Sequence, residues 1–174
     1  MKYLIIVDVQ NDFVDGALGT KEAVEMMPRL LEKVENFDGT ICVTKDTHSV
    51  DYLQTQEGKM LPVEHCIKGT PGWELPASLE KLIAGKEAAV YEKPTFGSTK
   101  LAEDFRKLYE EKKVESVELV GLCTDICVIS NALLLKAAMP EVTIKVDPGC
   151  CAGVTPEKHQ AALEVMRSCQ IIVE

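Results

Sequence analysis

The strongest constraint on the fold is an alternation of short apolar runs with longer segments of helical periodicity. A run of consecutive apolar residues is typical of a strand covered on both faces, whereas apolar residues repeated every three or four positions are typical of a helix. The alternation therefore predicts parallel strands joined by right-handed helical crossovers. The predicted strands occupy residues 2–8, 40–44, 88–91, 117–120, 142–147 and 171–173. We expect a three-layer α/β/α sandwich with a parallel six-stranded sheet, built by residues 1–174 as a single domain.

Turn and capping residues mark the expected ends of several helices and strands. Thr20 and Thr99 can each accept a hydrogen bond at the start of a helix, and Pro156 suits the first position of the last helix. Pro28 lies inside the first long helix and is expected to kink or restart it. Pro148, which is followed by a glycine, is expected to turn the chain after the fifth strand.

Charge and hydropathy exclude several kinds of partner. Lys and Arg total 19 against 28 Asp and Glu, which gives a formal net charge of -9, and the basic residues form no cluster. Binding to nucleic acid or to an anionic membrane surface needs clustered Lys and Arg, so neither partner is expected. The first apolar run is too short for a secretory signal, and no run is long enough to span a bilayer. We therefore expect a cytoplasmic protein.

The seven cysteines form neither a disulfide framework nor a Cys-x-x-Cys pair. Their number is odd and they are scattered through predicted strands and helices, which favours reduced thiols in a cytosolic protein. Cys150 and Cys151 follow the fifth predicted strand, and we expect them to contribute to packing rather than to chemistry.

One cysteine has a position that suits a nucleophile. The segment GLCTDICV at 121–128 joins the fourth predicted strand to a long apolar helix, so Cys127 should lie in the first turn of that helix. The N–H groups of a first turn have no intrahelical partner and the helix dipole is positive there, which biases a thiol toward thiolate. The alternative interpretation is a small buried side chain that fills the joint between strand and helix.

Polar residues follow several of the predicted strands. In an open parallel sheet, functional groups gather beyond the carboxyl ends of the strands. Taken singly, such an Asp could form a turn and such a Lys could lie in solvent. Together they supply an acid, a cation and a thiol, the combination that covalent catalysis needs. The residues at these ends are Asp8, Asp46, His48, Lys93, Cys127 and Asp147.

Three segments resemble the signatures of the isochorismatase-like cysteine hydrolases, in the order of that family and across essentially the whole chain. They are VDVQNDF at 7–13, KPTFGS at 93–98 and GLCTDICV at 121–128. The resemblance implies a Rossmann-like parallel six-stranded sheet between helix layers and a catalytic triad of Asp8, Lys93 and Cys127. It also implies an oxyanion hole formed by the backbone N–H groups of Cys123 and Cys127, with a cis peptide bond between Leu122 and Cys123.

Within that family, the nicotinamidases carry a metal site built from an Asp-x-His and a later His. This chain has Asp46 and His48, followed by His65 in a similar segment. An aspartate and two histidines suit one divalent ion, for which we expect zinc with iron or manganese as alternatives, and they leave positions for water and substrate. The fourth family ligand is His or Glu, and Glu57 is the candidate here, ahead of Asp51 and Glu64. The alternative is that the two histidines only form hydrogen bonds within a loop.

The resemblance implies an amidohydrolase that converts nicotinamide, a small-molecule amide, to nicotinate and ammonia through a thioester on Cys127. Phe13 is expected to stack on the ring, and Leu61 or Pro62 takes the place of an aromatic residue that precedes the distal histidine in many nicotinamidases. One alternative is another hydrolase of the family that acts on an N-carbamoyl compound, a ureido amide or isochorismate. A second is a non-catalytic module that binds a small ligand. Assembly into a homo-oligomer is left open.

Overall fold

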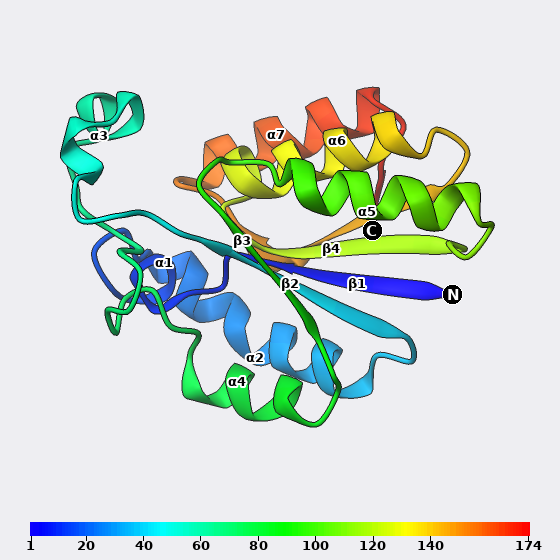
Figure 1. The fold of residues 1–174 in the computed structure, drawn as a ribbon, viewed down its shortest axis with the longest axis horizontal. Helices are drawn as coiled ribbons and strands as arrows, with labels where there is room; N and C mark the ends of the chain where they lie inside the picture. Colours follow the sequence, from blue (N-terminus) through cyan, green and yellow to red (C-terminus); the bar gives the residue numbers. More distant parts are fainter.

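The computed structural model describes residues 1–174 and contains one sheet of six strands, all of them parallel (Figure 1). The strand order is β3-β2-β1-β4-β5-β6, so the chain builds outward from β1 to one edge and then returns to the other side of β1. The predicted parallel sheet is confirmed, and its topological switch point lies between β1 and β4. The strands are β1 Lys2–Val7, β2 Thr40–Asp46, β3 Ala89–Lys93, β4 Ser116–Leu122, β5 Thr143–Ala152 and β6 Ile172–Val173.

Helices cover both faces of the sheet (Figure 1). One face carries α2 (Lys21–Asn36) and α4 (Ala77–Ala84), and the other carries α5 (Thr99–Glu110), α6 (Ile129–Ala138) and α7 (Pro156–Ser168). The short elements are α1 Asn11–Val14, the 3-10 turn η1 Tyr52–Gln54, α3 Gln56–Met60 and the π-helical turn η2 Thr124–Val128. The expected three layers are therefore present. None of the helices combines the length and the apolar character that crossing a bilayer would require.

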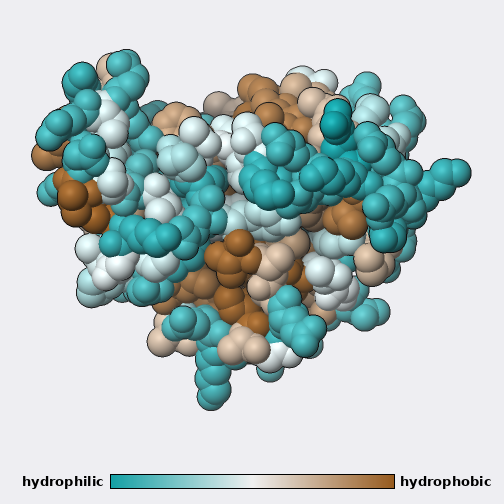
Figure 2. Space-filling model, in the orientation of Figure 1, coloured by the Kyte–Doolittle hydropathy of each residue, from teal (hydrophilic) through white to brown (hydrophobic).

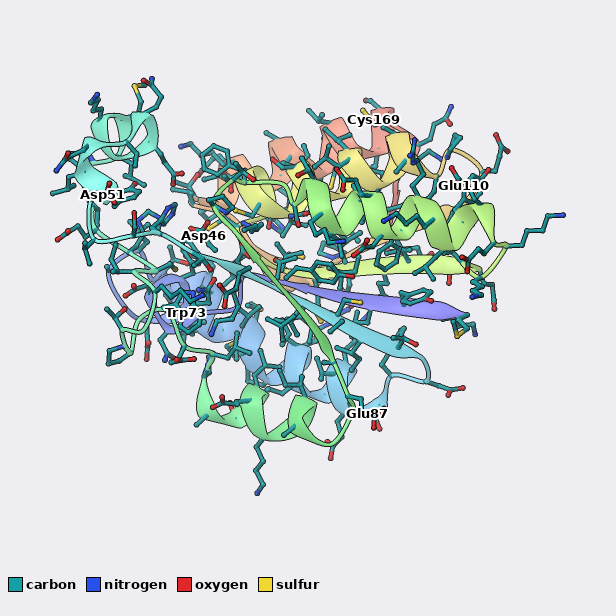
Figure 3. All side chains as sticks on the ribbon, viewed as in Figure 1. Asp46, Asp51, Trp73, Glu87, Glu110 and Cys169 are labelled. Carbon is teal, nitrogen blue, oxygen red and sulfur yellow. The ribbon has the colours of Figure 1, made fainter.

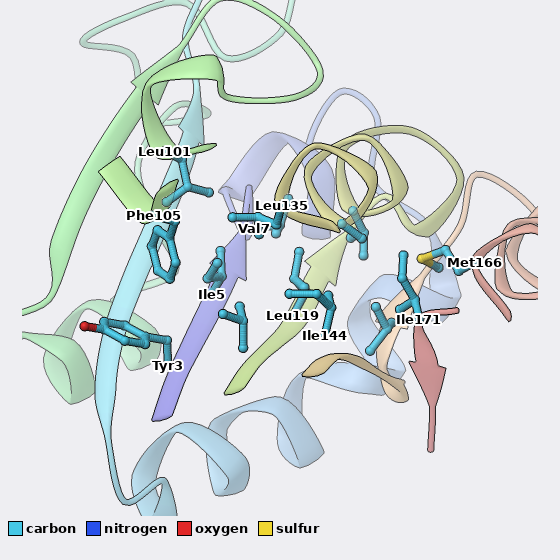
Figure 4. Packing of buried hydrophobic residues seen from close by; sticks show 14 of the residues in the cluster. Tyr3, Ile5, Val7, Leu101, Phe105, Leu119, Leu135, Ile144, Met166 and Ile171 are labelled. Carbon is cyan, nitrogen blue, oxygen red and sulfur yellow. The ribbon is translucent and has the colours of Figure 1, made fainter. Parts of the chain in front are cut away.

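The core divides into two halves because successive strand residues point to opposite faces of the sheet. In β1, Leu4 and Ile6 face α2 and α4, whereas Tyr3, Ile5 and Val7 face α5, α6 and α7. Figure 4 shows the second half, where Phe105 of α5 packs edge-on against Tyr3 with ring centroids 4.9 Å apart. Both faces of the central strands are thus buried, which explains their unbroken apolar runs.

Two of the three predicted caps and starts are confirmed, the cap predicted at Thr99 is wrong, and the restart that Pro28 could cause does not occur. Thr20 accepts a hydrogen bond from the N–H of Ala23 at the start of α2, and Pro156 occupies the first turn of α7. The cap of α5 is Ser98, which accepts from the N–H of Leu101, so Thr99 is already helical. Pro28 does not restart α2, which runs unbroken from Lys21 to Asn36. The buried apolar face on both sides of Pro28 outweighs the one backbone hydrogen bond that proline removes.

The fifth strand extends further than the sequence predicts. Pro148 and Gly149 do not turn the chain, because β5 continues through them to Ala152. The pairing with β4 shifts register between Leu119 and Gly121, and this irregularity accommodates a proline that has no N–H to donate. Asp147 is therefore in the middle of a strand, and its predicted place at the carboxyl edge is wrong.

Asp147 instead belongs to a structural ion cluster on the α2 side of the sheet. Its buried carboxylate lies 2.7 Å from Lys33 Nζ and 3.2 Å from Arg29 Nη2, and Lys33 also pairs with Glu118. These charged groups line a surface hollow of about 670 Å³ that contains none of the other site residues named from the sequence. The hollow carries matched charges and lies apart from the chemistry described below.

The surface is mostly polar on the face seen in Figure 2, with an exposed apolar area near the middle of that face. The edge strand β3 contributes to the exposed apolar surface, since Val90 is 53% exposed. All seven cysteines are unpaired. Cys150 and Cys151 are both buried and belong to the two opposite halves of the core, which agrees with the expectation that they pack.

Candidate active site

Four strands end at one edge of the sheet and bring the predicted catalytic residues together. Asp8 directly follows β1, Asp46 and Lys93 are the last residues of β2 and β3, and Cys127 lies in η2 after β4. Asp46 and Lys93 are also paired in register. All four side chains are buried, with 4% exposure or less, so their charges act on one another with little screening.

Asp8 is held in an unusual backbone conformation. Its φ is +49°, in the left-handed region that residues other than glycine rarely adopt and that is common at functional sites. Thr44 fixes it from the neighbouring strand, because its carbonyl accepts from the Asp8 N–H and its hydroxyl donates to Asp8 Oδ1 at 2.6 Å. On the other side Gly121 has φ +120°, and a Cβ there would lie 2.2 Å from the Val7 carbonyl oxygen. Only glycine allows β1 and β4 to approach so closely at the site.

Lys93 connects the acid to the thiol. Its Nζ lies 2.5 Å from Asp8 Oδ2 and 3.6 Å from Cys127 Sγ, and it donates a hydrogen bond to the Thr95 carbonyl at 2.9 Å. Asp8 Oδ2 is in contact with this ammonium but accepts no aligned hydrogen bond. That oxygen therefore remains able to accept a proton, and the arrangement has the adjacent base and nucleophile that covalent catalysis requires.

Burial controls the protonation of the three groups. Burial raises the pKa of the Cys127 thiol well above its ordinary value, Asp8 raises it further, and Lys93 only partly opposes them. Burial also raises the pKa of Asp8, against the influence of Lys93. Burial would lower the pKa of Lys93, but the charges of Asp8 and Cys127 raise it overall. Desolvation therefore opposes the bias toward thiolate that the helix start predicts for Cys127, and Lys93 acts in the same direction as the helix start.

The turn that carries the nucleophile is not a regular first helical turn. The N–H groups of Ile126 and Val128 both donate to the Cys123 carbonyl at 3.1 Å, which widens the turn into a π-helix. The bond between Leu122 and Cys123 is cis, as the resemblance implied. No backbone carbonyl accepts from the Cys123 N–H. This N–H is thus available as a donor to a developing oxyanion.

The predicted metal ligands converge beside these groups. One ligand atom from each of Asp46, His48, Glu57 and His65 lies within 4.8 Å of the others. His48 Nε2 is 2.8 Å from Asp46 Oδ2, and Glu57 Oε1 is 3.6 Å from His48 Nε2 and 3.7 Å from His65 Nε2. His65 Nδ1 donates to the Val63 carbonyl at 2.8 Å, which leaves the Nε2 lone pair directed to a ligand. Two histidines and two carboxylates fit a divalent ion such as zinc.

The structure distinguishes among the three acids that could complete this set. Glu57 comes from α3 and joins the cluster, whereas Asp51 and Glu64 do not. Figure 3 shows Asp46 at the edge of the sheet and Asp51 on the arm that carries α3, away from it. Burial raises the pKa of Glu57. Burial would also raise the pKa of Asp46, but hydrogen bonds with His48 and His65 lower it overall.

Several residues that brace the site had no clear signal in the sequence. Tyr52 is fully buried, and its ring lies 4.7 Å from that of His48 and 4.9 Å from that of His65. The Gln10 side chain accepts from the Asp46 N–H and donates to the Asp46 carbonyl, as a neighbouring strand would. Gln10 lies within the VDVQNDF segment, so the sequence could have identified it as a candidate site residue. Tyr52 lies in a stretch without periodicity, so only the fold reveals it.

The two predicted substrate contacts occupy different environments. The Phe13 side chain is buried, and its ring lies 5.4 Å from the ring of His65. Leu61 caps the end of α3 and is 38% exposed, and its carbonyl accepts from the Tyr52 hydroxyl. Phe13 is thus beside the ligand cluster, whereas Leu61 lies at the exposed end of α3.

A polar cleft gives access to the ligand cluster from the surface. Its volume is about 550 Å³, and hydrophobic residues are absent from its lining. His48 and Glu57 form part of its wall, so the ligand cluster is open to solvent on this side. The lining residues are Thr47, His48, Ser49, Thr55, Gln56, Glu57, Lys68 and Pro94.

The sequence is similar to a known protein family and to known proteins over nearly its whole length. The isochorismatase domain model matches residues 2–174. The chain is 30% identical to a nicotinamidase of Schizosaccharomyces pombe over 98% of this chain and 91% of the relative. It is 28% identical to the nicotinamidase/pyrazinamidase of Mycobacterium tuberculosis, over 98% of this chain and 97% of the relative.

Solved structures agree over the full length. The crystal structure of a nicotinamidase/pyrazinamidase from Bacillus subtilis superimposes with a TM-score of 0.83 at 29% identity and covers 99% of this chain and 98% of its own. A pyrazinamidase of Pyrococcus horikoshii in complex with zinc gives a TM-score of 0.78 at 27% identity, with the same coverage of both chains.

Proposed function

The chain belongs to the isochorismatase family, and on that premise we propose that it is a nicotinamidase, which hydrolyses nicotinamide to nicotinate and ammonia. The observation that carries the proposal is the direct contact between two sets of residues. Asp8, Lys93 and Cys127 supply an amide-cleaving nucleophile, and Asp46, which pairs with Lys93, also belongs to the metal-ligand cluster. A small amide bound across this junction would present its carboxamide to the thiol and its ring to the ligand cluster.

In the first half of the reaction, Cys127 Sγ attacks the amide carbon while Asp8 takes the thiol proton. The raised pKa of Asp8 suits it to hold this proton, and the Lys93 ammonium stabilises the negative charge that passes between acid and sulfur. The backbone N–H groups of Cys123 and Cys127 donate to the oxyanion. When the tetrahedral intermediate collapses, the C–N bond breaks and Asp8 returns the proton to the departing ammonia.

In the second half, water attacks the thioester carbon and Asp8 takes one of its protons. The C–S bond breaks, Asp8 returns its proton to Cys127 to regenerate the thiol, and the acid product releases the second water proton to solvent as nicotinate. Lys93 stays protonated throughout, which its raised pKa supports. Each half therefore uses Asp8 once as base and once as acid.

The residues that would hold a divalent ion are Asp46, His48, Glu57 and His65, and we propose zinc because two imidazoles and two carboxylates suit it. When bound, such an ion supplies a Lewis-acid site for a ring nitrogen of the substrate. Phe13, beside His65, packs against the ring, and Leu61 contributes to the rim of the pocket. Iron or manganese are the alternative ions for this donor set.

A second candidate function is hydrolysis of a different small amide by the same triad, such as an N-carbamoyl or ureido compound. It is favoured by Leu61, since an exposed aliphatic residue at the rim gives less ring packing than an aromatic one. A non-catalytic binding module has no use for a buried acid, ammonium and thiol in contact, and this argues against it. The seven unpaired cysteines support a reducing compartment, the cytoplasm, where nicotinamide released from NAD would be the substrate.

The test is ammonia release from nicotinamide by the zinc-loaded protein and by Cys127→Ala. We expect release by the wild type and loss of at least about a thousandfold in the variant. A wild type that releases ammonia from a ureido compound but not from nicotinamide would favour the second candidate. Removal of the ion with a chelator should abolish activity, and addition of zinc should restore it.

A further inference from the structure

Asn131 is a buried polar residue of α6 whose side chain makes three hydrogen bonds. It is 1% exposed and lies one helical turn after Cys127. Its Oδ1 accepts from the Ser98 N–H at 2.9 Å, while its Nδ2 donates to the Phe96 carbonyl at 3.2 Å and to the Cys127 carbonyl at 2.8 Å. One side chain therefore links the backbone of the nucleophile to the loop that follows β3.

That loop, residues 94–98, also packs very closely on the same helix. A Cβ at Gly97 would lie 2.5 Å from Leu134 Cδ1 and 3.3 Å from the Ser130 carbonyl oxygen. Glycine thus lets the loop backbone approach α6, and the hydrogen bonds of Asn131 hold it there. Two independent features fix the loop against α6, the helix that directly follows the turn carrying the thiol.

The loop in turn holds the ammonium of Lys93. The Thr95 carbonyl accepts from Lys93 Nζ at 2.9 Å, and the same Nζ lies 3.6 Å from Cys127 Sγ and 2.5 Å from Asp8 Oδ2. Lys93 ends the edge strand β3, which has only β2 as a neighbour in the sheet. The strand alone therefore fixes the lysine from one side, and the loop carbonyl fixes it from the other.

We propose that Asn131 is a positioning residue that sets the distance between the Lys93 ammonium and the Cys127 thiol through the loop at 94–98. Because both groups are buried, a small displacement of the ammonium changes the stability of the thiolate substantially. The proposal concerns the thiol that the proposed function uses as nucleophile. The reactivity of that thiol can be measured without any amide substrate.

A purely structural role for Asn131 would have a different signature. Without Asn131, the buried Ser98 N–H and the Phe96 and Cys127 carbonyls lose a hydrogen-bond partner, so any variant should lower the stability of the fold. Loss of stability alone leaves the pH dependence of the thiol in the folded protein unchanged. A shift in that dependence therefore reports the position of the ammonium.

The experiment measures the rate at which iodoacetamide alkylates Cys127 as a function of pH, by mass spectrometry of the peptide that contains it. Asn131→Leu removes all three hydrogen bonds at similar volume, and Gly97→Ala pushes the loop away from α6 while keeping Asn131. In both variants the profile should move to higher pH, and alkylation near neutral pH should slow about tenfold for every tenfold fall in the thiolate fraction. Ser130→Ala, beside Asn131 on α6, is the matched control and should keep the wild-type profile.

Circular dichroism identifies the variants that are folded under the conditions of alkylation. An unshifted profile in either folded variant would overturn the proposal, and a shift in Ser130→Ala equal to theirs would do the same. If Asn131→Leu does not fold, Gly97→Ala decides alone: the end of the Leu134 side chain can rotate away from its added methyl, but the Ser130 carbonyl oxygen at 3.3 Å belongs to the helix backbone, so the loop has to shift to make room. Shifted profiles in a protein that releases no ammonia from nicotinamide would support the role of Asn131 and contradict the proposed function.

Discussion

Lys93 Nζ lies 3.6 Å from Oδ1 of Asp46, and the other oxygen of Asp46 lies 2.8 Å from His48 Nε2. One carboxylate therefore faces the catalytic ammonium with one oxygen and the metal-ligand cluster with the other. Asp46 is the last residue of β2. Because it contacts both Lys93 and His48, the catalytic triad and the metal-ligand cluster lie side by side. A substitution at Asp46 should therefore have two separable effects.

Asp46→Asn should weaken zinc binding and at the same time make Cys127 more reactive. The first effect follows from loss of a ligand, for which we expect a decrease in affinity of at least about tenfold. The second follows because the charge of Asp46 raises the pKa of the Cys127 thiol, and the variant removes that charge. Zinc content after dialysis and the alkylation rate of Cys127 measure the two. Asp51→Asn, an exposed acid outside the cluster, should change neither, and a slower alkylation in Asp46→Asn would contradict the expected coupling.

Cys123→Ala should retain nearly the full rate of ammonia release, within about twofold. The proposed mechanism uses the backbone N–H of Cys123 and not its sulfur, so Ala preserves the donor to the oxyanion. Steady-state kcat for nicotinamide measures the effect, with the inactive Cys127→Ala as the reference. A large loss of kcat in folded Cys123→Ala would show that the sulfur itself takes part.

The pH profile of kcat/KM should have an acid limb above the range of an ordinary carboxyl group. Asp8 must be ionised to take the thiol proton, and burial raises its pKa, so activity should fall as the pH drops through this raised value. Asp8→Asn should remove the activity together with the limb. A limb at the ordinary Asp value of 3.8 in the wild type would contradict the role of burial at this residue.

Asp147→Asn should lower stability near neutral pH, by about 1 to 3 kcal/mol, without reducing activity. Burial would raise the pKa of Asp147, but hydrogen bonds and the charge of Lys33 lower it overall in the folded state. A carboxyl group with a lowered folded pKa adds stability above its unfolded pKa, and that stability is lost as the pH falls through the folded value. The difference in unfolding free energy between wild type and variant should therefore vanish in acid. Urea titrations at neutral and acidic pH measure it, and a difference that persists unchanged in acid would contradict the ion-cluster interpretation.

The sheet could be predicted from the sequence to the extent that its strands are covered on both faces. Central strands such as β1 and β4 are unbroken apolar runs because neither face meets water, and such runs are visible without a partner. The end of β5 could not be placed, because Pro148 signals a turn locally and the continuation depends on irregular pairing with β4. The helix does not restart at Pro28 for a similar reason, since its buried face packs against the sheet on both sides of the proline.

The candidate site likewise contains features that the sequence predicts and features that only the fold reveals. Predicted strand ends pointed to Asp8, Lys93 and Cys127 but also to Asp147, and the resemblance of three segments to a known family separated the triad from the rest. The fold brings the three together. The raised pKa of the Cys127 thiol was not identifiable, because it results from burial by residues that are distant in the sequence. Tyr52 and Asn131 act through contacts with distant parts of the chain, and no periodicity or motif marks such contacts in advance.

Lys93 ends an edge strand, so we expect its part of the site to unfold before the parts that carry Asp8 and Cys127 when the protein is heated. Asp8 and Cys127 follow the central strands β1 and β4, whereas β3 is largely exposed and bonded on one side only. Local opening of β3 therefore costs less free energy than opening of the centre, and its amide hydrogens should exchange faster than those of β1. Heat should then inactivate the protein reversibly while the centre of the sheet is still intact.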